Sequence, residues 1–112
     1  MPVLKSKDAI ITKVKDGVHR HFVHANNLMT AVIDFDNGPW KEPDLPHQHV
    51  HEQTTYIAEG EIIFSCEGED DQKLVTGDMF WVPSNKMHTI QLLTEKARLV
   101  DSFNPIREEF LL

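Results

Sequence analysis

The predicted fold rests on one stretch of the chain, Gln53-Thr54-Thr55-Tyr56-Ile57-Ala58-Glu59-Gly60-Glu61-Ile62-Ile63-Phe64-Ser65-Cys66. Its two halves, residues 53–58 and 61–66, are rich in β-branched and aromatic side chains, which favour strands. Glu59-Gly60 stands between the halves and predicts a tight hairpin turn. The stretch therefore predicts two short strands that follow each other directly in the chain.

The rest of the chain repeats this pattern of short strands and turns. Residues 28–35 alternate, with an apolar row that begins at Met29, as in a half-buried strand. Because evenly spaced short strands are typical of sandwiches and barrels, the sequence predicts an all-β fold. A helix within 86–104 is a weaker alternative, because β-branched and aromatic residues alternate there. The other predicted strands are 9–14, 18–24, 73–75, 78–82, 88–93 and 97–103, with turns at Asn26-Asn27, Thr76-Gly77 and Thr94-Glu95-Lys96.

Size and composition restrict the class of protein. The chain has 112 residues, 40% of them hydrophobic, which suits a single domain over residues 1–112. No apolar run approaches the roughly 18 residues that span a bilayer, so we expect no transmembrane segment. Residues 1–8 lack the apolar core of a secretory signal and Cys66 is the single cysteine, so we expect a soluble, cytoplasmic protein. The net charge of −7 argues against nucleic acid or an anionic membrane as a partner.

Histidines gather at two places in the sequence. His47-Gln48-His49 places two imidazoles on one face of a strand, and Gln53 has the same parity. His88 follows a glycine turn, a predicted strand and a proline turn, so a neighbouring strand can deliver a third imidazole to the same place. The spacing predicts a metal site. The alternative is a set of ordinary surface histidines or hydrogen-bonded core histidines.

Two motifs carry a family resemblance, His47-x-His49-x3-Gln53-x6-Gly60 and Gly77-x5-Pro83-x-Asn85-x2-His88. They resemble the two motifs of the cupins, and the resemblance covers about residues 28–104. Gln53 stands where the usual ligand is glutamate, and Asn85 where glycine is usual; an amide oxygen can ligate, and asparagine tolerates a positive φ. The resemblance implies a double-stranded β-helix, the cupin jelly-roll barrel, followed by a tail at 105–112.

The same resemblance implies one divalent metal bound by His47, His49, Gln53 and His88. Imidazole nitrogens and an amide oxygen suit Mn, Fe, Co, Ni, Cu or Zn. Because all four ligands are neutral when bound, the ion keeps its full double positive charge, which favours Lewis-acid chemistry and anion binding. His51 shares the parity of these ligands and is a rival, which we expect at the rim of the site. We expect exposed or oligomer-interface positions for His19, His21 and His24.

A second row of candidate residues lies near the C-terminus. Asp101 falls between Leu99 and Phe103 in a period-two row that starts at Ala97. A carboxylate in an apolar, inward row is costly without a partner, so Asp101 is a candidate functional residue. The alternative is a structural aspartate at a strand end that accepts a hydrogen bond from a backbone N–H.

The tail offers a cation and apolar side chains. Arg107 either folds back over the barrel mouth or is a solvated tail residue, and Phe110, Leu111 and Leu112 predict that the tail is docked. Trp40 and Met87 either line the mouth or take part in ordinary packing.

Residues 101–111, together with His51-Glu52-Gln53, resemble parts of the small cupins of pectin degradation. Those enzymes open cyclic 4,5-unsaturated uronates from pectin or alginate to linear keto acids. The resemblance implies active-site roles for Asp101, Phe103 and Arg107. Asp101 would transfer the proton, Phe103 would offer a face to the sugar ring, and Arg107 would hold the substrate carboxylate.

The sequence thus predicts metal-dependent ring opening and ketonisation of a small anionic sugar acid. Two other functions stay open: a non-catalytic module that binds sugar acids or carboxylates through its metal, and a metal-dependent dioxygenase. The neutral ligand set departs from the 2-His-1-carboxylate pattern of non-haem iron oxygenases, which disfavours the last. Resemblance to cupins of this size also implies a homodimer, with the N-terminal strands as interface.

Overall fold

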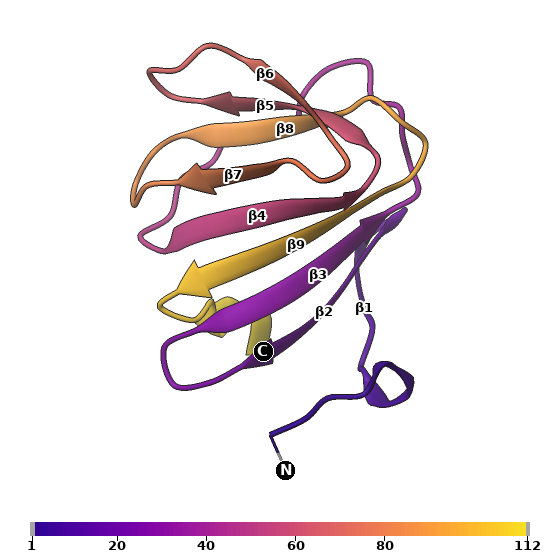
Figure 1. Ribbon diagram of the computed structural model, residues 1–112, viewed down its shortest axis with the longest axis vertical. Coiled ribbons are helices and arrows are strands. Elements are labelled where there is room, and N and C mark those ends of the chain that lie inside the picture. Colours follow the sequence, from indigo (N-terminus) through magenta and orange to yellow (C-terminus); the bar gives the residue numbers. More distant parts are fainter. Residues whose placement is uncertain (1, 112) are drawn as a thin grey trace.

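The computed structural model describes residues 2–111 as two antiparallel sheets that enclose a core (Figure 1). The first sheet has the strand order β1-β2-β3-β9-β4-β7, and the second has the order β6-β5-β8. The strands are β1 (Thr12–Lys15), β2 (Val18–His24), β3 (Met29–Phe35), β4 (Glu52–Glu59), β5 (Glu61–Cys66), β6 (Gln72–Val75), β7 (Met79–Val82), β8 (His88–Leu92) and β9 (Ala97–Asn104). Two 3-10 helices flank them, η1 (Ser6–Asp8) and η2 (Glu108–Leu111).

The predicted all-β class is confirmed, and the arrangement is the jelly-roll barrel of a double-stranded β-helix. The alternative of a helix within 86–104 is wrong, because that segment forms strands β8 and β9. In β9, buried residues alternate with more exposed ones, as in a strand with one face on the core. In residues 2–111, no helix is both long and apolar enough to cross a bilayer.

The predicted hairpin at Glu59-Gly60 is wrong. Strand β4 pairs with β7 and β9, whereas β5 pairs with β6 and β8, so the chain crosses from one sheet to the other at Gly60. Gly60 has φ +93°, and a Cβ there would lie 2.5 Å from the carbonyl oxygen of Lys96. Only glycine fits this corner, because the backbone bends sharply there and also packs against the backbone of Lys96 and Ala97.

The turns at Thr76-Gly77 and at 94–96 also connect strands of different sheets. By contrast, the turn at Asn26-Asn27 joins the paired strands β2 and β3, whose register runs from Val18 opposite Phe35 to His24 opposite Met29. Local sequence marks where the chain turns, whereas the choice of pairing partner depends on which sheet faces can bury their apolar rows together.

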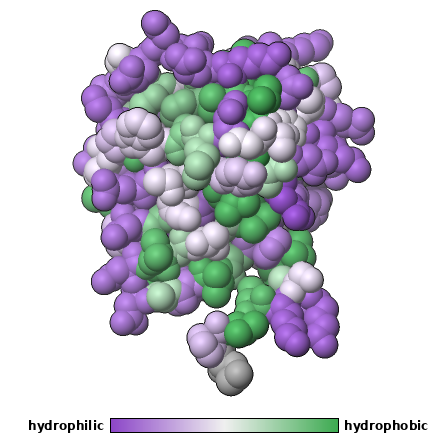
Figure 2. All heavy atoms as spheres, in the orientation of Figure 1, coloured by the Kyte–Doolittle hydropathy of each residue, from purple (hydrophilic) through white to green (hydrophobic). Residues whose placement is uncertain are grey.

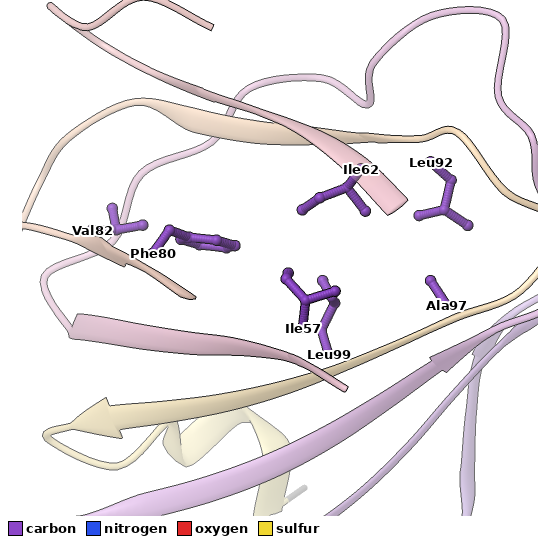
Figure 3. Close-up of a cluster of buried hydrophobic side chains, with 7 residues drawn as sticks. All are labelled: Ile57, Ile62, Phe80, Val82, Leu92, Ala97 and Leu99. Carbon is purple, nitrogen blue, oxygen red and sulfur yellow. The ribbon is translucent and has the colours of Figure 1, made fainter. Parts of the chain in front are cut away.

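Most of the core lies between the two sheets (Figure 3). Ile57 from β4 and Leu99 from β9 are register partners, and they face Ile62 and Leu92 of the opposite sheet. The predicted inward row of β9 is confirmed, since its alternate residues from Ala97 to Phe103 are buried. A second cluster contains Met29, Ala31 and Phe103, with Phe22, Ile106 and Phe110 packed against it.

The C-terminal tail packs against this second cluster. The ring of Phe110 lies 6.1 Å from that of Phe22 and 5.9 Å from that of Phe103, measured between centroids. Leu111 is exposed, and Leu112 lies outside the described residues. Phe110 therefore brings the tail against the inner face of the larger sheet, close to the end of β9.

Candidate metal centre

Three imidazoles converge at one end of the barrel. His47, His49 and His88 each offer a ring nitrogen, and these three atoms lie within 4.8 Å of one another. His88 begins β8, and His47 pairs with it through two backbone hydrogen bonds of 3.0 and 2.9 Å. The ring centroids are 4.3 Å apart for His47 and His88 and 4.9 Å apart for His49 and His88. The pairing brings together histidines that are far apart in the sequence.

The segment that contains His47 and His49 is not the regular strand that the sequence predicts. His47 makes an isolated bridge, and the carbonyl of His49 accepts a hydrogen bond of 2.8 Å from the backbone N–H of Asn85. Asn85 has φ +64°, so it takes the glycine-like conformation expected of it. Because the loop around Asn85 holds the His49 backbone, both imidazoles reach the site without continuous strand pairing.

Backbone carbonyls determine which nitrogen of two rings carries the proton. Nδ1 of His49 lies 2.8 Å from the carbonyl oxygen of His51, and Nδ1 of His88 lies 2.8 Å from that of Lys86. A carbonyl only accepts, so both Nδ1 atoms are protonated and both Nε2 atoms present a lone pair. Within residues 2–111, Nε2 of His88 is buried without a hydrogen-bond partner. Backbone contacts of this kind orient metal-binding histidines.

The charge state of the cluster also suits a cation. Burial, followed by the nearby His88 and His49, lowers the pKa of His47 from 6.5 to about 4. Burial likewise lowers the pKa of His49 and of His88, and Arg107 contributes to the lowering at all three rings. The imidazoles are therefore neutral at pH 7, as metal ligation requires.

Gln53, near the start of β4, directs its amide oxygen at the histidines. Its Nε2 donates to Oγ1 of Thr55 at 2.9 Å and to Oδ1 of Asp101 at 3.4 Å. Its Oε1 lies 3.2 Å from Nε2 of His49, which has no proton to donate. Two lone-pair atoms thus face each other, an arrangement that a shared cation would stabilise. The donor set fits a divalent metal bound by three imidazoles and one amide oxygen.

Asp101 lies beside this cluster on the inward face of β9. It is 8% exposed, and its Oδ1 accepts a hydrogen bond of 2.6 Å from Thr55 and one of 3.4 Å from Gln53. Burial raises its pKa from 3.8 to about 6, against the opposing effects of Thr55, Arg107 and Gln53. The alternative of an aspartate at a strand end, held by the backbone, is wrong, because Asp101 is inside β9 and its partners are side chains.

Arg107 folds back over the barrel. Its side chain is 18% exposed, and its Nε donates to Oε1 of Glu109 at 2.5 Å. The guanidinium carbon lies 5.2 Å from the ring centroid of Phe103 and 4.8 Å from that of Phe110. Of the two alternatives, the solvated tail residue is therefore wrong.

Phe103 lies next to the histidines but is covered. Its ring centroid is 6.0 Å from that of His49 and 6.4 Å from that of His51, and the residue is 2% exposed. The expected open face for a sugar ring is therefore absent from this structure. Phe103 instead supports His49 and Arg107 by packing.

The remaining candidates have supporting or separate roles. His51 is outside the three-histidine cluster, and its carbonyl orients His49. Trp40 packs on the core, edge-to-face with Phe35. Its backbone N–H donates to the carbonyl of Leu92, at the opposite end of β8 from His88, so Trp40 does not line the site. Met87 is partly exposed next to His88. On β2, His19 and His21 are half-buried and His24 is exposed.

Sequence reasoning missed Thr55, which donates the short hydrogen bond to Asp101. The signal was present, because Thr55 has the same parity as Gln53 two residues earlier. Its importance depends on the pairing of Thr55 with Asp101 across two strands that are far apart in the chain.

Known proteins resemble this chain in sequence and in structure. The family model described as "Cupin domain" matches residues 31–103. The pectin degradation protein KdgF of Dickeya dadantii is 35% identical over 98 residues, which cover 86% of this chain and 86% of that protein. In structure, KdgF from Halomonas sp. is similar with a TM-score of 0.83 at 30% identity, covering 95% of this chain and 94% of the other.

Other solved structures extend the comparison. An RmlC-like cupin from Shewanella frigidimarina has a TM-score of 0.84 at 30% identity and covers 96% of this chain and 93% of its own. Oxalate decarboxylase from Bacillus subtilis has a TM-score of 0.76 at 21% identity, covers 92% of this chain and 29% of its own, and shares the fold. With the match over residues 31–103 and the identity to KdgF, the chain belongs to the cupin family.

Proposed function

We propose that this cupin is a metal-dependent enzyme that opens cyclic 4,5-unsaturated uronates and ketonises them to linear keto acids. One observation carries the proposal: a buried carboxyl group, Asp101, is hydrogen-bonded to Gln53 beside the three-histidine cluster. The likeness to two KdgF proteins, one of which is named for pectin degradation, supports this substrate class.

The proposed ligands are His47, His49, Gln53 and His88, which would hold one divalent transition metal. Such an ion would polarise a substrate oxygen and, with only neutral ligands, would keep its full charge toward an anionic sugar. The metal can be Mn, Fe, Co, Ni, Cu or Zn, because imidazole and amide ligands suit all of them.

Asp101 is the group proposed to move the proton. In the reaction the anomeric hydroxyl loses its proton, the bond between the anomeric carbon and the ring oxygen breaks, and the resulting enolate becomes a ketone when C4 gains a proton. No oxidant is needed, since one proton leaves oxygen and one arrives at carbon. A carboxyl group with its pKa raised to about 6 can both accept and donate a proton near neutral pH.

Arg107 is proposed to hold the substrate carboxylate. Its guanidinium lies over Phe103 and Phe110, and Glu109 engages its Nε. The outer edge of the guanidinium can form a paired, bidentate contact with a carboxylate. Phe103 is proposed to position this guanidinium.

The test is to incubate the wild-type protein with unsaturated galacturonate freshly released by a pectin lyase reaction. Ultraviolet absorbance of the conjugated double bond should fall faster than in buffer, and removal of metal by a chelator should abolish the acceleration. Product analysis should find the linear keto acid. If the absorbance fell no faster with metal-loaded, folded protein than in buffer, the proposed activity would be contradicted.

The alternatives give different results in the same experiments. A binding module would bind the sugar acid without accelerating its decay, and Asp101 variants would then change affinity alone. A dioxygenase would consume oxygen in proportion to substrate. The neutral ligand set disfavours this alternative.

A homodimer formed through the N-terminal segment belongs to the same proposal. The chain before β1 stands away from the sheets in Figure 1, β1 at the sheet edge is exposed throughout, and Ile10 is 84% exposed. Figure 2 shows hydrophobic side chains on the lower part of the molecule, where this segment lies. Light scattering after size exclusion should give twice the chain mass, and Ile10→Lys should shift the mass toward the monomer. The single domain over 1–112 and the cytoplasmic location stay predictions.

A further inference from the structure

Arg20 points into the barrel, where apolar side chains are expected. It lies on β2 between Val18 and Phe22, which share its face; Val18 is buried and Phe22 packs on the second core cluster. Its register partner on β3 is Ile33. An arginine in the inward row of a strand is costly unless an anion compensates its charge.

The guanidinium of Arg20 is held by stacking. Its central carbon lies 3.7 Å from the ring centroid of Phe110, and Arg107 lies 4.8 Å from the same ring. Within residues 2–111, Nε of Arg20 is buried without a hydrogen-bond partner, and no carboxylate forms an ion pair with it. Arginine is suited to this role because its planar group stacks on rings and still leaves its donors free.

The two arginines act on each other. Burial and the charge of Arg107 lower the pKa of Arg20, whereas Glu109 opposes that effect. Two positive groups on one ring therefore share a single nearby carboxylate, which is bonded to Arg107. A second anion would relieve this imbalance.

We infer that Arg20 and Arg107 together form a two-arginine site for the substrate carboxylate, with Glu109 as its counter-ion in the free protein. The inference rests on the proposed function and deepens it. The site would select uronates and related carboxylates over neutral sugars. The ring of Phe103 lies between this site and the metal cluster, since its centroid is 5.2 Å from the guanidinium carbon of Arg107 and 6.0 Å from the ring centroid of His49.

Calorimetric binding of D-galacturonate, a saturated uronate without the double bond that ketonisation requires, tests the inference on the protein as purified with its metal. Arg20→Met should weaken binding about 10- to 100-fold, the effect of losing charge-assisted hydrogen bonds. Arg98→Met is the matched control, because Arg98 pairs with Asp34 on the outer face of the sheet and its loss should leave affinity unchanged. D-galactose, the neutral counterpart, should bind wild type and Arg20→Met alike.

Glu109→Gln separates an anion site from a purely structural clamp on the tail. If Glu109 competes with the substrate for the arginines, its neutral variant should bind galacturonate more tightly and lower KM. A structural clamp predicts the opposite, since losing the bond to Arg107 would loosen the tail. In turnover, Arg20→Met should raise KM more than it lowers kcat.

The outcomes distinguish the two proposals. If Arg20→Met weakens galacturonate binding but wild type does not turn over any unsaturated uronate, the enzyme proposal fails and the anion site stands. If a folded, metal-loaded Arg20→Met keeps wild-type galacturonate affinity, or if wild type does not bind galacturonate, the anion site is overturned. Arg20→Gln replaces Arg20→Met where the latter does not fold, with the same expectation and the same contradicting result.

Discussion

Strands β4 and β9 carry two adjacent inward-facing pairs, called here the apolar end (Ile57 and Leu99) and the polar end (Thr55 and Asp101), which are both buried but differ in chemistry. At one end Ile57 faces Leu99 across the strands, and at the other Thr55 faces Asp101, only two residues further along each strand. The apolar end gains stability from removing surface from water. The polar end gains stability from hydrogen bonds alone, so its residues depend on one another. The contrast shows that burial by itself does not distinguish core from candidate site.

Asp101→Asn addresses the polar end and has the largest expected effect. The amide keeps the size of the side chain, so the fold and the metal content should persist. Turnover of unsaturated galacturonate should fall about 10²- to 10⁴-fold, the usual effect of losing a positioned acid or base. Turnover, metal content and melting temperature are measured on the same samples. Wild-type turnover by the folded, metal-loaded variant would remove Asp101 from the catalytic assignment.

His88→Ala addresses the proposed metal ligand that β8 contributes. Wild type should carry close to one transition metal ion per chain by elemental analysis, and the variant should lose most of it, because the chelate loses one of four ligands. His49→Ala should behave in the same way. His24→Ala is the control, since His24 is exposed on β2 and is not a member of the cluster. If both cluster variants retained wild-type metal, the proposed ligands would be incorrect.

Ile57→Ala addresses the apolar end. Truncation of a fully buried isoleucine should lower the free energy of unfolding by about 2–5 kcal/mol, through lost burial and the cavity it leaves. Denaturant titration measures the change, and metal content per folded chain should not move. Met79→Ala, at an exposed position, should change stability by only about 0.5 kcal/mol. Loss of metal from folded Ile57→Ala would show that the two ends are coupled.

The pH dependence of stability compares the ends within one protein. Because burial raises the pKa of Asp101 from 3.8 to about 6, the folded state holds its proton more tightly than the unfolded state. This contribution stabilises the metal-free protein below about pH 4 and is lost as the pH rises through 6. Relative to wild type, Asp101→Asn should therefore gain stability between pH 4 and 7, by about 3 kcal/mol at most.

His47 contributes a pH dependence of stability opposite in sign to that of Asp101. Its pKa falls from 6.5 to about 4, so its unfolded state binds more protons and stability increases as the pH rises through this range. This effect is common to wild type and Asp101→Asn, and it cancels in the difference between them. Denaturant titrations after chelation give the measurement. A difference that stays constant from pH 4 to 7 would contradict the raised pKa of Asp101.

Gln53→Glu changes a hydrogen-bond partner of the polar end, and of these variants it has the smallest expected effect. A negatively charged ligand should retain or tighten the metal, while one unit less of net positive charge should weaken the capture of an anionic sugar. Metal dissociation under a competing chelator and the KM for unsaturated galacturonate measure the two changes. Loss of metal together with a lower KM would argue against the neutral ligand set.

Sequence by itself determined the strand positions, the places where the chain turns and the candidate metal ligands. Alternation along residues 28–35 and 97–103 identifies inward rows because a strand side chain points to one face at every second residue. The cupin motifs located His47, His49, Gln53 and His88, and a positive φ at Asn85 could be expected from its side chain. These features follow from local geometry and from spacing within short segments.

Tertiary structure alone decided which strands pair and which side chains meet. The chain crosses between sheets at Gly60 instead of forming a hairpin, because the two sheets bury their apolar rows against each other. Packing of the tail covers Phe103 and brings Arg107 to the same ring as Arg20, a residue from the opposite end of the sequence. Such contacts join segments about ninety residues apart, and their energies depend on burial and distance, which no local pattern of residues records.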